Sequence, residues 1–67
     1  MNKIAEFIKM ERNAAHLTQE QFAARSGIGL HALRALEQGK DNITLNKLNQ
    51  ALAMFGMEAV PGRKWDD

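Results

Sequence analysis

Residues 18–39, TQEQFAARSGIGLHALRALEQG, limit what this chain can fold into more than any other segment does. Thr18 is a good N-cap, and Gln21 three residues later completes a capping box, which predicts a helix that begins just after Thr18. Gly27 ends this helix, because glycine adopts the positive φ that a turn of three or four residues requires. Leucines then recur at helical spacing until Gly39, which stands where a helix is expected to stop. The segment therefore predicts two short helices joined by a tight turn, at residues 19–25 and 30–37.

Apolar periodicity predicts one further helix on each side of this unit, at residues 2–14 and 45–54. Thr44 is the expected N-cap of the later helix, and Gly56 is its expected C-terminal stop. The residues expected to face the core fall on one helical stripe in each case: Ile4, Phe7, Ile8 and Ala15 along the first helix and just after it, and Leu45, Leu48, Leu52 and Phe55 along the last helix and just after it. The predicted fold class is all-α, with four helices.

The segment after the last helix, residues 57–60, alternates imperfectly between apolar and polar and could form a short strand or an extended tail. A lone strand has no partner inside a helical chain, so the expected partner is the same segment of a second subunit. We therefore divide the chain into a helical domain, residues 1–56, and a tail, residues 57–67, for dimerisation or partner contact. The residues expected to make that contact are Phe55, Met57, Val60 and Trp65. Trp65 either anchors a partner, since tryptophan is enriched at interface hot spots, or folds back on its own domain or dimer.

A chain of 67 residues makes one small domain, whose single core is expected to supply only about 3–5 kcal/mol of stability. Oligomerisation is therefore a reasonable expectation. The net charge is only +1. A subunit of such low charge would make few phosphate contacts with nucleic acid, and a dimer would be needed for useful affinity.

The residue types needed for several kinds of chemistry are missing. The chain has no cysteine, which excludes disulfides and thiolate zinc sites and leaves secretion without support. Its histidines, His16 and His31, lie in different predicted elements, and Ser26 lies in a turn, so neither a catalytic triad nor a metal site can be assembled. No apolar run is long enough to cross a membrane, and the N-terminus lacks the apolar centre of a signal peptide. We expect a cytoplasmic, non-enzymatic protein without a cofactor, metal or small-molecule substrate.

The combined pattern resembles the lambda-repressor/Cro-type helix-turn-helix family over residues 4–55. The matching landmarks are Arg12, Leu17-Thr18-Gln19-Glu20-Gln21-Phe22-Ala23, Gly27-Ile28, Leu33, Leu36-Glu37, Gly39-Lys40 and the stripe of the last helix. The resemblance implies a homodimer that binds double-stranded operator DNA with helix 30–37 in the major groove. The two half-sites would then lie about 34 Å apart, or a multiple of that distance.

Within this family the chain is most similar to small antitoxins of the HipB-like type. The similarity rests on Gly27-Ile28-Gly29-Leu30-His31, Leu36-Glu37-Gln38-Gly39-Lys40 and Phe55-Gly56-Met57-Glu58. It implies a repressor of its own operon that also neutralises a kinase-type toxin. Two alternatives stand beside it: a stand-alone phage-type or mobile-element repressor without a toxin, and a protein-interaction module on the same fold without DNA binding.

The chain departs from the wider family at the start of helix 30–37. Gly29 stands where a hydroxyl or Asn cap is more usual, at a cost of roughly a few tenths of a kcal/mol. Leu30 is apolar at a position that is commonly polar in the family. This apolar residue and the modest net charge are what permit the protein-interaction alternative.

The candidate base-reading residues lie on helix 30–37 and are Leu30, His31, Arg34 and Ala35. The Arg34 guanidinium can reach guanine O6 and N7 together, although a solvated surface arginine is the alternative. His31 could contact a base or a phosphate, or be simply exposed. Leu30 could meet a thymine methyl, because an apolar side chain at the start of an exposed helix is expected to have no use in the core.

The candidates for contacts to the DNA backbone are Gln19, Gln38, Lys40 and Asn42. The resemblance implies that Gln19 clamps a phosphate with help from the positive end of its helix; alternatively, it only covers the first helical turn. For the other three residues, a solvated loop is the alternative. The resemblance also implies an ion pair between Arg12 and Glu37, which would hold helix 30–37 against helix 2–14.

Overall fold

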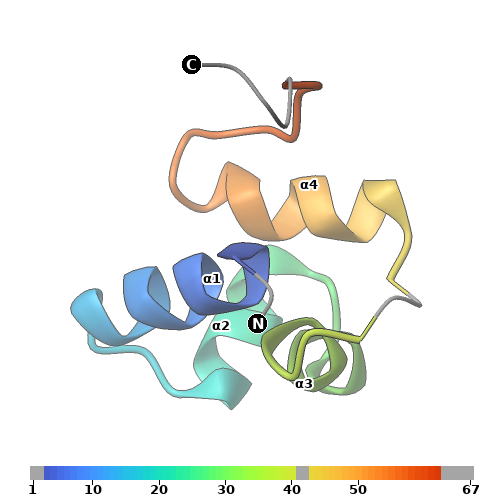
Figure 1. The fold of residues 1–67 in the computed structure, drawn as a ribbon. Coiled ribbons are helices and arrows are strands. Elements are labelled where there is room, and N and C mark those ends of the chain that lie inside the picture. The colour runs from blue at the N-terminus through green and yellow to red at the C-terminus, as the bar shows by residue number, and fades with distance from the viewer. Residues whose placement is uncertain (1–2, 41–42, 63–67) are drawn as a thin grey trace.

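The computed structural model describes residues 3–40 and 43–62, and it contains four α-helices (Figure 1). The helices are α1 (Lys3–Ala14), α2 (Gln19–Ser26), α3 (Leu30–Glu37) and α4 (Leu45–Ala53). Every predicted helix is present, and each observed boundary lies within one residue of the predicted one. The described residues contain no strand, which confirms the all-α class.

Local capping interactions explain where α2 begins and ends. The Thr18 hydroxyl accepts a hydrogen bond from the backbone N–H of Gln21 at 3.1 Å, and the Gln21 side chain accepts one from the N–H of Thr18 at 2.9 Å. This is the predicted capping box. At the other end, Gly27 has a φ of 80° and its N–H donates to the carbonyl of Ala23. The left-handed glycine turns the chain toward α3.

Gly29 has a different role from the one expected of it. Its φ is 84° and its ψ is 152°, a combination that is essentially restricted to glycine, and no side chain caps α3. Gly29 is therefore not a weak substitute for a hydroxyl cap. It is required because the backbone between α2 and α3 passes through a conformation that a residue with a Cβ would resist.

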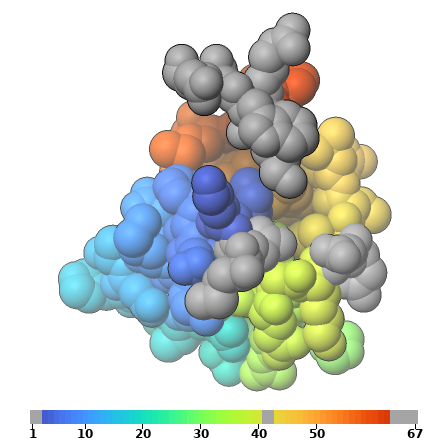
Figure 2. Space-filling view, viewed as in Figure 1, coloured from blue at the N-terminus to red at the C-terminus, as the bar shows by residue number. Residues whose placement is uncertain are grey.

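All four helices contribute to one core. The largest of its fully buried side chains are those of Phe22, Ile8 and Leu33. The Phe55 ring lies 5.7 Å from the ring of Phe22, and 6.2 Å from the ring of Phe7 in an edge-on arrangement. In Figure 1, α4 crosses above α1, and α3 lies at the other side of the molecule from the C-terminal segment. The space-filling view shows α1 and α3 in direct contact on the same face (Figure 2).

Three residues predicted to face the core are exposed: Ile4, Ala15 and Leu45. Ile4, in the first turn of α1, is 38% exposed. Ala15 lies beyond the end of α1, where the chain turns at His16 with a φ of 59°, so the helical stripe does not continue to it. Leu45 is 63% exposed, and Ile43, just before α4, packs against the core in its place. Ala5 and Ala51 are buried instead, because a small side chain allows close approach of neighbouring helices.

In this single chain, residues 57–60 form an extended tail, which is one of the two forms expected of them. A strand needs a partner ladder, and the described part of this single chain offers none. Gly56, with a φ of 70°, and the bond from the Met57 N–H to the Leu52 carbonyl close α4 as predicted. The Ala59 N–H then donates to the side chain of Asn49 at 2.7 Å, so the described part of the tail folds back onto α4.

Candidate nucleic-acid interface

A bidentate ion pair between Arg12 and Glu37 joins α1 to the end of α3. Arg12 Nε lies 2.6 Å from Glu37 Oε2, and Arg12 Nη2 lies 3.0 Å from Glu37 Oε1. The third nitrogen, Arg12 Nη1, donates to the carbonyl of Leu17 at 2.8 Å, in the loop before α2. The Glu37 side chain is only 3% exposed. The structure thus brings the two predicted partners together at the point where α1, α3 and the loop to α2 meet.

The electrostatics of this pair favour the charged form of Arg12. Its side-chain hydrogen bond to Glu37 raises the pKa of the Arg12 guanidinium above its ordinary value, and partial burial opposes this rise only in part. Because its pKa is higher in the folded than in the unfolded protein, charged Arg12 adds to the free energy of unfolding. This contribution is fully present at every pH below the ordinary pKa of arginine, and it is lost only as the pH rises through the higher folded-state pKa. Arg12 therefore carries its charge throughout the neutral range.

The outer face of α3 presents His31, Arg34 and Gln38 to solvent, with Ala35 half-buried between them. These positions are spaced i, i+3, i+4 and i+7, so they share one face. Leu30 does not belong to it. It is half-buried and packs against the core, because it lies three residues before Leu33 on the inner side of the helix. The expectation that Leu30 has no use in the core is wrong.

Gln19 connects the ion pair to the outer face of α3. Its Nε2 donates to Glu37 Oε1 at 3.1 Å, and its Oε1 accepts a hydrogen bond from Arg34 Nε at 3.4 Å. The neighbouring Glu20 lies 3.8 Å from Arg34 Nη2, with both side chains about half-exposed or more. Gln19 therefore does more than cover the first turn of α2. The contacts of Gln19 and Glu20 with Arg34 had no counterpart in the sequence interpretation, because they depend on the angle between α2 and α3.

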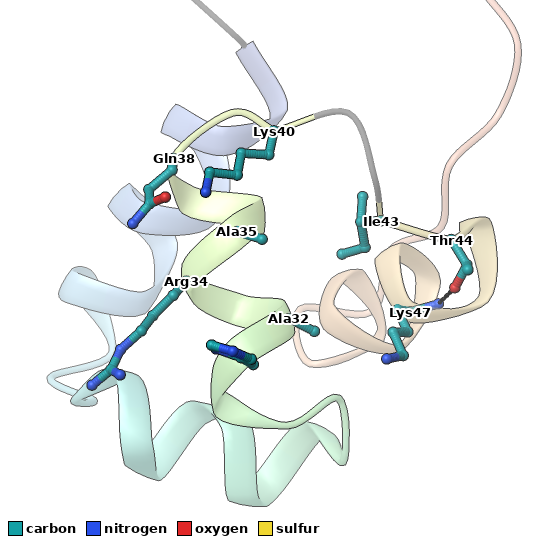
Figure 3. A pocket seen from close by; sticks show the side chains of 9 residues that line it. Ala32, Arg34, Ala35, Gln38, Lys40, Ile43, Thr44 and Lys47 are labelled. Atoms are coloured by element: carbon teal, nitrogen blue, oxygen red, sulfur yellow. Dashed lines mark hydrogen bonds between the residues drawn. The ribbon is translucent and has the colours of Figure 1, made fainter.

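A cleft of about 420 Å³ lies between α3 and the start of α4 (Figure 3). The residues of its lining that the structure describes include three cationic side chains and, among them, no carboxylate: His31, Ala32, Arg34, Ala35, Gln38, Lys40, Ile43, Thr44 and Lys47. In Figure 3, Arg34 points to one side of α3, whereas Ala32 and Ala35 point toward the start of α4. A cleft of this composition attracts an anionic chain along its length.

Lys47, Ala32 and Ile43 are the members of this cleft that the sequence did not point to, and Thr44 was expected only as an N-cap. The Thr44 hydroxyl accepts a hydrogen bond from the backbone N–H of Lys47 at 3.2 Å, as expected for an N-cap. That signal places Lys47 in the first turn of α4 but does not say which element it faces. Lys40 and Gln38 are exposed at the end of α3, and Asn42 lies outside the described residues, as does Trp65.

The predicted partner-contact residues fall into two groups. Phe55 is half-buried and packs on the rings of Phe7 and Phe22, so it serves the core of its own chain. Met57 and Val60 are 48% and 72% exposed. Only these two of the described tail residues offer apolar surface of the kind that a partner would cover.

Other kinds of site find little support in the described part of the chain. No group of three His, Cys, Asp or Glu residues there is arranged to hold a metal ion. None of the described helices is long and apolar enough to cross a membrane.

Comparison with known proteins agrees with the geometry. A family model described as helix-turn-helix matches residues 8–59, which is most of the chain and includes all of α2, α3 and α4. No curated protein and no solved structure matches the chain significantly. The match spans the capped turn, the buried ion pair's Arg12 and Glu37, and the cationic cleft. The chain therefore belongs to the lambda-repressor/Cro-type helix-turn-helix family and is a DNA-binding transcription regulator.

Proposed function

We propose that this protein is a sequence-specific transcriptional repressor that binds its operator as a homodimer, with one α3 in each major groove. The observation that carries the proposal is the cleft along α3, whose described lining holds the three cationic side chains of Arg34, Lys40 and Lys47. A helix with an exposed polar face beside such a cleft fits the width and the charge of a DNA groove.

In this proposal the outer face of α3 reads bases. Arg34 donates two hydrogen bonds to guanine O6 and N7, and His31 contacts a base or a phosphate. Ala35 meets a thymine methyl. Leu30 lies beside this face and not on it, so it would meet a second methyl only with the part of its side chain that the core leaves exposed. These contacts would specify the sequence, because the base edges in the major groove differ in their donors, acceptors and methyl groups.

The contacts to the DNA backbone would position the helix. We assign them to Gln19, Gln38, Lys40 and Asn42, and we add Lys47 because it lines the same cleft as Lys40. Phosphate contacts carry no sequence information of their own, but they set the register of α3 in the groove.

A homodimer is supported by the size and charge of the chain. A subunit with a net charge of +1 gains little from phosphates alone, and two linked subunits multiply the affinity. Met57 and Val60 are exposed and belong to the tail, whose described part lies on the side of α4 away from α3 in Figure 1. A second subunit that binds there leaves both copies of α3 free for DNA.

The finer role that we propose is that of an antitoxin of the HipB-like type, which represses its own operon and neutralises a kinase-type toxin. Its support is the resemblance of the turn, the end of α3 and the start of the tail to such proteins. The alternative without a toxin, a phage-type or mobile-element repressor, would have the same DNA-binding face.

The experiment for DNA binding is a selection of operator sequences from random duplexes, followed by a salt titration of the best one. We expect a site with two half-sites and an affinity that falls steeply as the salt concentration rises, because bound phosphates release counterions. A protein that selects no sequence and whose contacts are insensitive to salt would support the protein-interaction alternative. The core packing of Leu30 already removes one of the two features that favoured that alternative.

The experiment for the antitoxin role is a pull-down of the tagged protein from its native host, with bound DNA and bound protein identified together. Recovery of its own promoter with a kinase-like protein encoded beside it supports the autorepressing antitoxin. Recovery of promoter DNA alone supports a repressor without a toxin.

A further inference from the structure

A continuous path of hydrogen bonds leads from the buried ion pair to the exposed face of α3. It runs from Arg12 to Glu37, from Glu37 to Gln19 and from Gln19 to Arg34, with donor–acceptor distances of 3.0, 3.1 and 3.4 Å along the Glu37 Oε1 branch. Its first member lies on α1, its third on α2, and its second and fourth on α3. The path therefore leaves α3 at its buried end and returns to α3 on its outer face.

Glu37 determines which way the amide of Gln19 points. An amide carries a donor group and an acceptor group at the same distance from the backbone, so its orientation depends on its partners. Glu37 Oε1 accepts from both Arg12 and Gln19, and a carboxylate oxygen offers no hydrogen to donate. Gln19 must turn its Nε2 inward, which leaves its Oε1 facing outward.

The outward Oε1 is an acceptor, and Arg34 supplies the matching donor. The bond uses Arg34 Nε and not its terminal nitrogens. Nε is the nitrogen closest to the aliphatic part of the side chain. A hydrogen bond at Nε therefore fixes the orientation of the whole guanidinium plane and does not involve Nη1. Glu20 lies at 3.8 Å from Nη2 with its side chain 67% exposed, and an ion pair of that kind holds a side chain only weakly.

We propose that Gln19 is a positioning residue for Arg34: it passes the orientation set by the buried Glu37 to the guanidinium that reads DNA, and so decides which base pair Arg34 reads. This inference rests on the proposed function in that Arg34 contacts a base. A phosphate contact by Gln19 would affect the affinity for all sequences alike, whereas this inference assigns to Gln19 an effect on base discrimination. The amide of Gln19 keeps a second N–H for a phosphate, so both contacts are compatible.

The first test uses the free protein and needs no DNA. In Gln19→Met, which keeps the length of the side chain and removes both polar groups, we expect the Arg34 Nε–H to exchange with water about two- to tenfold faster by NMR, since one hydrogen bond is lost. Gln38→Met is the matched control, because it makes the same change on the exposed end of α3. An Arg34 Nε–H that exchanges equally fast in the wild type and in Gln19→Met would overturn the inference.

The second test measures base discrimination with a set of single-base operator variants. Gln19→Met is expected to lose about two- to tenfold of the discrimination at one base pair and to keep it at the others. In an Arg34→Ala background, the same substitution should cause no further loss at that base pair. An equal weakening for all sequences, with discrimination unchanged, would show that Gln19 only contacts a phosphate and would overturn the inference.

The two tests separate failure of this inference from failure of the proposed function. If the wild type selects no operator, the proposed function fails, and the assignment of a base-reading role to Arg34 falls with it. The exchange of the Arg34 Nε–H still decides whether Gln19 holds the guanidinium. Thermal unfolding of Gln19→Met, monitored by circular dichroism, confirms that both measurements are made on folded protein.

Discussion

Glu37 is the buried charged residue of the described segments, and both of its oxygens are used. Glu37→Gln removes the charge and leaves the Arg12 guanidinium without its counter-ion. Breaking a buried ion pair costs about 3–5 kcal/mol. We expect the lower end, about 3 kcal/mol, because Arg12 keeps its bond to the Leu17 carbonyl and reaches some solvent. The measurement is the free energy of unfolding in urea.

The matched control for this substitution is Glu58→Gln, which makes the same chemical change at an exposed position of the tail. We expect it to change the free energy of unfolding by less than about 0.5 kcal/mol. Equal unfolding curves for the two variants would contradict a stabilising role for the Arg12–Glu37 pair.

Gly29 offers a test of backbone conformation alone. Gly29→Ala is expected to destabilise the protein by about 1–3 kcal/mol, because its φ and ψ are unfavourable for a residue with a Cβ. Crowding contributes nothing, since an added Cβ would meet no atom within 4 Å. Gly62→Ala is the control: it also adds its Cβ to open space, but without a positive φ. If both variants unfold at the same temperature, the conformational explanation fails.

At the level of elements, we propose that the outer face of α3 reads bases and that the start of α4 contacts the DNA backbone, and mutations can separate these two roles. Arg34→Ala should weaken specific binding by about 1–3 kcal/mol and relax discrimination at one base pair. Lys47→Ala should weaken binding to all sequences alike and reduce the slope of affinity against salt by about one charge. The measurement is a salt titration on the best operator and on a single-base variant. Discrimination unchanged in Arg34→Ala would mean that Arg34 does not read a base.

The position of the described part of the tail depends on a hydrogen bond to the side chain of Asn49 in α4. Asn49→Ala removes the acceptor of the Ala59 N–H, so we expect that amide to lose protection from hydrogen exchange and the protein to lose about 1 kcal/mol of stability. Asn46→Ala, one turn earlier on α4 and exposed, is the control, because it makes the same change in helix propensity. An Ala59 amide that stays protected in Asn49→Ala would show that other contacts hold the tail.

The elements themselves were largely predictable. Thr18, Gln21, Gly27 and Gly56 act within one turn of the chain, so their effects on helix ends do not depend on the rest of the fold. The predictions went wrong where a residue's environment comes from another element. Leu45 follows the apolar stripe of α4 yet is exposed, because Ile43 fills the nearby part of the core.

At the scale of the whole molecule, α3 and the described part of the tail, residues 57–62, lie at opposite sides in Figure 1. A dimer that forms through the tail would leave the DNA-binding face open on each subunit. Removal of residues 57–67 should therefore shift the protein toward the monomer in sedimentation, because it deletes the exposed Met57 and Val60. It should also weaken binding to a two-half-site operator more than binding to a single half-site. A truncated chain that still sediments as a dimer would place the interface on α4, where Leu45 is exposed.

The sequence predicted which α3 residues belong to the candidate site better than it predicted how the residues of the site are arranged in space. His31, Arg34 and Gln38 share a face because of helical spacing, which is a property of the sequence. Lys47 enters the same cleft only because α4 begins beside α3. Contacts between helices depend on the angles at which the helices pack, and these angles cannot be read from the spacing of residues along the chain.

The sequence by itself determined the all-α class, the ends of the helices and the family, because capping bonds and apolar periodicity act over three or four residues. Only the tertiary structure decided that Leu30 turns toward the core, that the tail lies along α4, and that Gln19 joins Glu37 to Arg34. The physical reason is that these contacts bring together residues of separate elements, 10 to 18 positions apart along the chain in the case of the tail and of Gln19 with its two partners. Their geometry follows from how the helices pack around Phe22, Ile8 and Leu33.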